Sequence, residues 1–192
     1  MLDRCTLFVF AAVAVAGACG GDAGDAAADA ASAAGAGEPA KLAGITQAHN
    51  QVRAMIQTSP ALEPLAWDDA LAATAAAWVA RCQDNDAPAG LIDHNPGRSE
   101  GHPYYVGENV FASTGNATGE AAVGSWAAEG ADYNLSTNAC AVDADCGHYT
   151  QLVWRTTLKL GCASGSCPRL RFSSTIVCDY GPGGNVNGQR PY

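Results

Sequence analysis

The sequence is poor in cationic side chains. Its 192 residues include 10 Lys and Arg against 19 Asp and Glu, which gives a formal net charge of −9 at pH 7. A protein that binds a phosphate backbone needs a basic stripe or patch. The charge balance therefore argues against a nucleic acid as the partner.

A long apolar run is missing as well. The apolar stretch near the N-terminus, Cys5–Ala18, has fourteen residues, which is short for a membrane span. With Arg4 before it, the stretch is typical of a signal peptide, predicted here over residues 1–18. The sequence AGAC then resembles a bacterial lipoprotein signal in which Cys19 is lipidated, and ordinary cleavage close to Cys19 is the alternative interpretation. Either route predicts a secreted protein or one tethered to the cell envelope.

Residues 19–38 contain no aromatic and no β-branched side chain. Such a segment cannot bury enough apolar surface to offset the entropy lost on ordering. We expect a disordered Ala/Gly/Asp tether here, followed by one folded domain over residues 39–192, in which no internal repeat is visible.

No CxxC pair is present, which disfavours a zinc cluster built from cysteines. Without Cys5 and Cys19, an even number of cysteines remains in the folded part. Such a set in an exported domain predicts three disulfides. Its members are Cys82, Cys140, Cys146, Cys162, Cys167 and Cys178.

Hydrophobic spacing predicts helices first and strands later in the chain. The predicted helices cover Leu42–Ile56, Asp68–Cys82 with Asp68 as N-cap, and Glu120–Tyr133. The predicted strands cover Leu160–Ala163 and Phe172–Tyr180, and residues 84–105 are expected to be irregular. Because βαβ alternation is missing, the expected class is α+β.

Six motifs in order carry a family resemblance. They are AHNQVRA (48–54), LAWDDALAATAAAW (65–78), GENVFAS (107–113), SWAAEGADYN (125–134), CGHYTQLVWRTTLKLGCA (146–163) and CDYGPGGNVNGQRPY (178–192). With them the chain resembles the CAP superfamily of cysteine-rich secretory proteins, insect antigen 5 and plant pathogenesis-related proteins of class one, as a bacterial-type exported member. The resemblance implies an α-β-α sandwich, with an antiparallel sheet flanked by helices and stapled by disulfides.

The resemblance also implies which cysteines pair and which side chains line a cleft. The implied pairs are Cys82–Cys167, Cys140–Cys146 and Cys162–Cys178. The implied cleft holds two His and two Glu, of which Glu108, Glu129 and His148 match the family motifs. His94 follows an apolar pair and is favoured as the fourth member, and His102, six residues before Glu108, is the alternative.

Two imidazoles and two carboxylates can hold Zn²⁺ or another divalent metal ion, and they can also hydrogen-bond one another without a metal. The first functional hypothesis is therefore a module that binds a divalent metal, a small hydrophobic ligand such as a sterol or fatty acid, or both. The second is a cell-surface interaction or defence protein. A metal-assisted hydrolase ranks third, because Thr150, Ser125 and Ser113 carry no nucleophile signature.

Overall fold

The computed structural model describes residues 37–192. The predicted signal peptide, the lipidation site Cys19 and most of the predicted tether lie outside the described residues. None of the helices within residues 37–192 combines the length and the apolar character needed to cross a bilayer.

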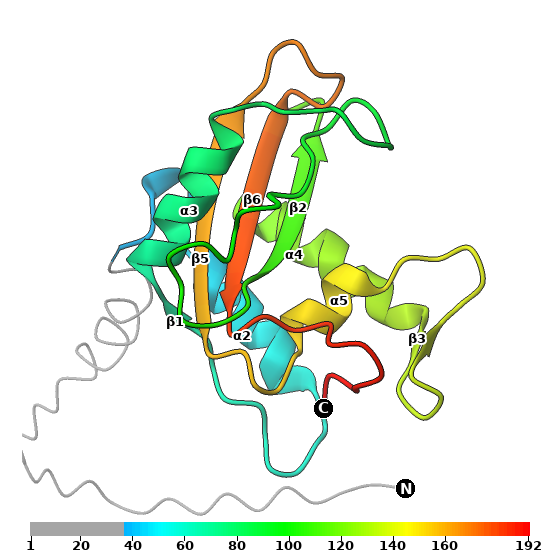
Figure 1. Ribbon diagram of the computed structural model, residues 1–192. Coiled ribbons are helices and arrows are strands. Elements are labelled where there is room, and N and C mark those ends of the chain that lie inside the picture. The colour runs from blue at the N-terminus through cyan, green and yellow to red at the C-terminus, as the bar shows by residue number, and fades with distance from the viewer. Residues whose placement is uncertain (1–36) are drawn as a thin grey trace, which may run out of the picture.

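A four-stranded sheet forms the centre of the domain, in the order β1-β5-β6-β2 (Figure 1). Its strands are β1 (Ala66–Trp67), β5 (Lys159–Ser166), β6 (Ser174–Gly181) and β2 (Gly107–Ser113). Strands β5, β6 and β2 are antiparallel neighbours, and the short β1 runs parallel to β5. A small hairpin, β3 (Tyr133–Asn134) with β4 (Ala139–Cys140), stands apart from this sheet.

Helices cover both faces of the sheet (Figure 1). Helix α3 (Asp69–Val79) packs on one face, where Trp78 and Val177 belong to one buried cluster. The other face buries Leu160 and Ile176 against the second group of helices. That group comprises α2 (Ile45–Met55), α4 (Gly119–Ala128) and α5 (Gly147–Leu152), with the 3-10 turns η1 (Ala40–Leu42) and η2 (Glu129–Ala131). The predicted α-β-α sandwich is therefore confirmed.

Helix α3 lies directly on the backbone of β5. A Cβ added to Gly161 would collide with the backbone nitrogen of Ala72 and lie 2.6 Å from the carbonyl oxygen of Asp68. Asp68 also caps the helix, because its side chain accepts hydrogen bonds from the backbone N–H groups of Ala70 and Leu71. The predicted N-cap is thus confirmed.

Three predicted boundaries were wrong for local reasons. Gly44 adopts a left-handed φ of 85° and divides the predicted first helix into η1 and α2. Cys82, at a positive φ of 47°, lies beyond the end of α3, and the third helix tightens into η2 after Ala128. Hydrophobic spacing had not predicted β2 or α5, whereas residues 84–105 are irregular as expected.

Three disulfides staple the domain. They join Cys82 to Cys167, Cys140 to Cys146 and Cys162 to Cys178, the same pairs that the family resemblance implied. The first closes the longest loop, with a sequence separation of 85. In the chain-entropy model such a loop contributes about 4–5 kcal/mol.

Arg53 is a buried cation whose guanidinium is hydrogen-bonded to backbone carbonyl oxygens. Its side chain is 1% exposed and makes five hydrogen bonds to the carbonyl oxygens of four residues, at 2.8–3.2 Å. These residues are Glu63, Leu152, Trp154 and Thr157. Burial lowers the pKa of the guanidinium to about 10, so it stays charged at neutral pH. Arg53 thereby joins α2 to the end of α5, to the loop that follows α5 and to the loop that follows α2.

His49 is buried as a neutral imidazole. Its Nδ1 lies 2.8 Å from the carbonyl oxygen of Ile45, so Nδ1 carries the proton and Nε2 accepts from the Tyr180 hydroxyl at 2.9 Å. Asn109 donates to that hydroxyl and to the backbone carbonyl oxygen of His148. Burial lowers the pKa of His49 from 6.5 to about 4. His49 therefore has a packing and hydrogen-bonding role in the core.

Replacing Arg53→Met should destabilise the domain by about 3 kcal/mol or more, because several buried carbonyl oxygens lose their donor. Denaturant unfolding measures the loss. Arg81→Met is the matched control, since Arg81 is exposed and its guanidinium donates no hydrogen bond within residues 37–192. Equal unfolding midpoints for the two variants would contradict the role of Arg53.

His49→Gln should reduce the loss of folding stability that occurs as the pH falls. Because the pKa of His49 is lower in the folded than in the unfolded chain, wild type loses stability as the pH falls from 6.5 to about 4. The loss amounts to about 3 kcal/mol over that window. Urea unfolding at several pH values measures it. Parallel pH profiles for wild type and variant would show that His49 does not cause the loss.

Candidate metal and ligand site

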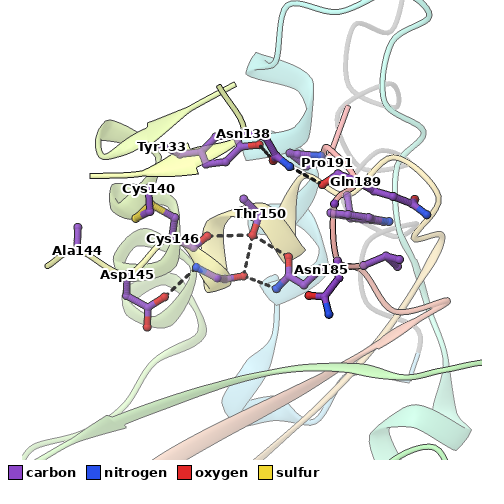
Figure 2. A pocket seen from close by; sticks show the side chains of 15 residues that line it. Tyr133, Asn138, Cys140, Ala144, Asp145, Cys146, Thr150, Asn185, Gln189 and Pro191 are labelled. Atoms are coloured by element: carbon purple, nitrogen blue, oxygen red, sulfur yellow. Dashed lines mark hydrogen bonds between the residues drawn. A yellow bond between two sulfur atoms is a disulfide. The ribbon is translucent and has the colours of Figure 1, made fainter. Parts of the chain in front are cut away.

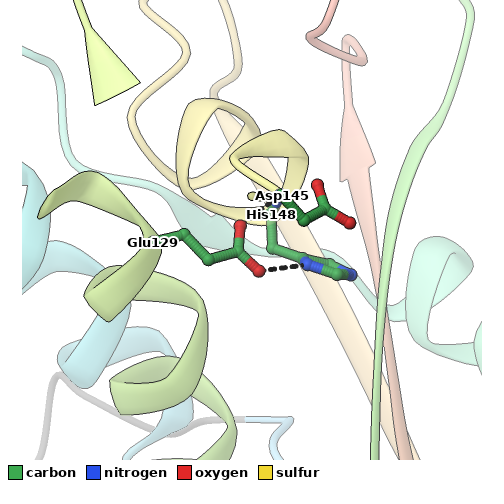
Figure 3. Close-up of side chains that lie close together, drawn as sticks. All are labelled: Glu129, Asp145 and His148. Atoms are coloured by element: carbon green, nitrogen blue, oxygen red, sulfur yellow. Dashed lines mark hydrogen bonds and ion pairs between the residues drawn. The ribbon is translucent and has the colours of Figure 1, made fainter. Parts of the chain in front are cut away.

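The first half of the site is a histidine held by a carboxylate. His148 lies in α5, and Glu129 lies at the start of η2, directly after α4. The Nδ1 atom of His148 is 2.5 Å from Oε1 of Glu129, and Figure 3 shows this carboxylate directed at the ring. Oε2 of Glu129 accepts from the backbone N–H groups of His148 and Tyr149, at 3.0 and 3.1 Å. The Glu129 carboxylate thus orients the His148 ring and also caps the first turn of α5.

The second half repeats this arrangement on another part of the chain. Nδ1 of His94 lies 2.6 Å from Oε1 of Glu108, which also accepts from the backbone N–H of Asn95 at 2.9 Å. The Glu108 side chain is fully buried in β2, whereas the His94 side chain is 57% exposed. This hydrogen bond joins His94, in the irregular segment, to Glu108, fourteen positions later in the edge strand β2.

Both imidazoles line one hollow of about 480 Å³. Because a carboxylate occupies Nδ1 in each ring, Nδ1 carries the proton and Nε2 keeps a free lone pair. The remaining walls are apolar in part, formed by Pro88, Leu91, Ile92 and Val110 among others. The hollow therefore offers two nitrogen ligands beside an apolar surface.

Asp145 is the site residue that sequence reasoning missed. It lines the same hollow, and it forms with Glu129 and His148 a group whose potential ligand atoms lie within 4.8 Å of one another (Figure 3). Within residues 37–192, that group does not include His94. Asp145 and Asp143 both lie in the loop before His148, and neither belongs to a motif that carries the family resemblance, so the sequence held no signal for Asp145.

His102, the alternative fourth member, lies elsewhere. Its Nε2 is 3.0 Å from the Thr74 hydroxyl on α3, and its ring stacks on Tyr104. His102 does not line the hollow shared by His94 and His148. Of the two alternatives, the geometry therefore selects His94.

A second buried carboxyl lies behind Glu108. Asp179 is opposite Glu108 in the antiparallel register of β2 and β6, and it is fully buried. Burial, and then the neighbouring charge of Glu108, raise the pKa of Asp179 to about 9. Asp179 is therefore protonated at neutral pH.

Fold and site together define a disulfide-bonded α-β-α domain with a hollow lined by two histidines, each of which is paired with a glutamate. The family model of the cysteine-rich secretory proteins, CAP, matches residues 46–180. The chain belongs to this family.

Curated relatives from animals and plants agree with the family. Mouse GLIPR1-like protein 1 is 34% identical over 163 residues, which cover 81% of this chain and 65% of the mouse protein. A pathogenesis-related protein of PR-1 type from Sambucus nigra is 40% identical over 146 residues, 76% of this chain and 78% of the relative. The match thus leaves about a third of the mouse protein uncovered.

Solved structures share the fold. Venom allergen-like protein 4 of Schistosoma mansoni is 30% identical with a TM-score of 0.55, over 77% of this chain and 90% of that one. A crystal structure of NaASP2 with Zn²⁺ is 27% identical with a TM-score of 0.59, over 77% of this chain and 82% of that one.

The expectation of a bacterial-type member finds no support in these relatives, which are eukaryotic. The lipoprotein-like start had motivated it, and that start lies outside the described residues. Three disulfides and a family of secretory proteins do indicate an extracellular protein.

The tautomers of the site histidines test this geometry. We expect His94 and His148 to show the Nδ1–H form in ¹⁵N-edited NMR spectra of the neutral protein, because each Nδ1 donates to a carboxylate. Glu129→Gln should change the imidazole resonances of His148 and leave those of His94 in place. An Nε2–H signal for His148 in wild type would contradict the site described here.

Proposed function

We propose that this extracellular domain binds a divalent cation, with Zn²⁺ as the first candidate, in the hollow between His94 and His148. The observation that carries the proposal is the pairing of each Nδ1 with a glutamate, which leaves Nε2 unpaired on two histidines that line one hollow. A carboxylate that orients a histidine in this way is the usual partner of a zinc-binding imidazole.

The roles of the carboxylates then differ from those in the sequence-based ligand set of His94, Glu108, Glu129 and His148. Both oxygens of Glu129 already accept hydrogen bonds, and Glu108 is fully buried. We therefore assign both glutamates to holding the histidines. Asp145, which is exposed and lies close to His148, is the carboxylate left to bind the ion.

The donor set fits this assignment. Imidazole nitrogen with a carboxylate oxygen suits Zn²⁺, and a site with two or three protein ligands keeps positions for water or another ligand. The solved relative NaASP2 was crystallised with Zn²⁺, which supports the same choice of ion.

The apolar wall supports a second candidate, a small ligand with an apolar part lying beside the ion. Leu91, Ile92 and Val110 share the hollow with the two histidines. Pockets that bind small molecules are commonly apolar with a few polar groups that fix orientation. A sterol or fatty acid, a role in cell-surface contacts, and anchoring through a lipid on Cys19 stay predictions.

Calorimetric titration of the full chain with Zn²⁺ tests the metal proposal. Wild type and His102→Ala should bind alike, because His102 lies outside the hollow. His148→Ala should lose binding, and Glu129→Gln should weaken it by about 10–100-fold through loss of ring orientation. His94→Ala should also weaken binding.

An unchanged affinity in His148→Ala would refute the proposal, and so would the lack of any saturable heat in wild type after removal of bound metal by chelation. If His102→Ala lost as much Zn²⁺ affinity as His148→Ala, the ion would have to bind in another part of the domain.

A further inference from the structure

A second hollow, of about 410 Å³, lies between the β3–β4 hairpin and the C-terminal tail (Figure 2). It adjoins the metal and ligand site, since Asp145 lines both. Amide and aromatic side chains dominate its walls. They belong to Tyr133, Asn138, Trp154, Asn185, Asn187 and Gln189.

One wall is the hairpin, and it is held in place. The Tyr133 hydroxyl donates to Oδ1 of Asn138 at 2.6 Å. Nδ2 of Asn138 donates to the backbone carbonyl oxygen of Gln189 at 3.1 Å, which ties the hairpin to the tail (Figure 2). The disulfide between Cys140 and Cys146 closes the loop between β4 and α5.

The opposite wall is held in the same manner. The Thr150 hydroxyl donates to Oδ1 of Asn185 at 2.7 Å, and Nδ2 of Asn185 donates to the backbone carbonyl oxygen of Gly147 at 2.8 Å (Figure 2). These bonds fix the tail to α5. The hollow is therefore formed before any ligand arrives, which lowers the entropy cost of binding.

One tryptophan on the walls of this hollow has an indole N–H without a hydrogen-bond partner among the described residues. Of the four tryptophans, Trp67, Trp78 and Trp126 each donate their indole N–H to an oxygen. The indole N–H of Trp154 makes no hydrogen bond to a described residue, and although the residue is only 4% exposed, this nitrogen is not one of the fully buried polar atoms that lack a partner. Solvent therefore reaches the indole N–H, and a ligand in the hollow can supply an acceptor for it.

The other unused groups are amides. The side chains of Asn187 and Gln189 are exposed and make no hydrogen bond within residues 37–192. Each amide offers both donors and an acceptor. Asp145 is the one charged residue on these walls, and none is cationic. A phosphate, sulfate or carboxylate would therefore find no counter-charge here.

We propose that this hollow binds a neutral saccharide. Sugar hydroxyls donate and accept at once, which matches the free amides and the indole N–H, and the apolar face of a sugar ring can lie against Tyr133. None of these groups belongs to the His–Glu pairs, so the proposal does not depend on metal binding.

The experiment is an NMR titration of the full chain, kept free of metal with EDTA, with cellotriose, maltotriose and chitotriose in turn. We expect saturable shifts of the Trp154 indole N–H and of backbone signals near residues 133–146 and 185–189 for at least one sugar. A dissociation constant of about 1 mM is expected.

The double variant Asn187→Ala with Gln189→Ala should weaken binding about tenfold, through loss of two hydrogen bonds. Neither side chain supports the fold, so the variant should unfold at the wild-type temperature. Asn116→Ala is the matched control, because Asn116 is exposed, makes no side-chain hydrogen bond to a described residue and lies outside the hollow.

The proposal is overturned if none of the three sugars shifts the Trp154 indole signal at about 10 mM, tenfold above the expected constant. It is also overturned if the double variant binds as tightly as Asn116→Ala, or if glucose 6-phosphate binds more tightly than the neutral sugars.

Discussion

A single buried guanidinium joins parts of the chain that are otherwise far apart. Arg53 binds the carbonyl oxygens of residues 63, 152, 154 and 157, and no carboxylate neutralises it among the described residues. A charge without hydrogen-bond partners could not be buried so completely. The position of α5, and with it the position of His148, therefore depends on a bond network that begins in α2.

The site follows from this constraint and from a second one at the other end of α5. Glu129 fixes the first turn of that helix and its histidine at once, while β2 carries Glu108 to His94. Asn109, the neighbour of Glu108, donates to the backbone carbonyl oxygen of His148 and so links the two halves of the site. The two imidazoles are thus held by carboxylates that lie in the sheet and at a helix end.

Much of the fold was predictable. The face of α3 and its cap at Asp68 followed from hydrophobic spacing and from a known capping preference. Strand β2 was missed because its seven residues, GENVFAS, do not alternate between apolar and polar positions. Helix α5, only six residues long, is too short for periodicity to reveal.

The candidate site was predictable only in part. Motif resemblance named Glu108, Glu129 and His148, but loop length between residues 84 and 105 left His94 and His102 open, and only the fold could separate them. Asp145 was missed because no local pattern distinguishes it from Asp143. The separate roles of the carboxylates depend on which atoms they contact, which no spacing in the sequence specifies.

Two imidazoles share one hollow, and their Nε2 atoms are free because glutamates occupy Nδ1. Anomalous diffraction at the zinc edge, on a crystal soaked with Zn²⁺, is the decisive measurement. The account predicts an ion in that hollow, about 2.0–2.1 Å from Nε2 of His148, with Glu129 still on Nδ1. An ion bound at Nδ1 with Glu129 displaced, or ordered zinc only outside the hollow, would contradict it.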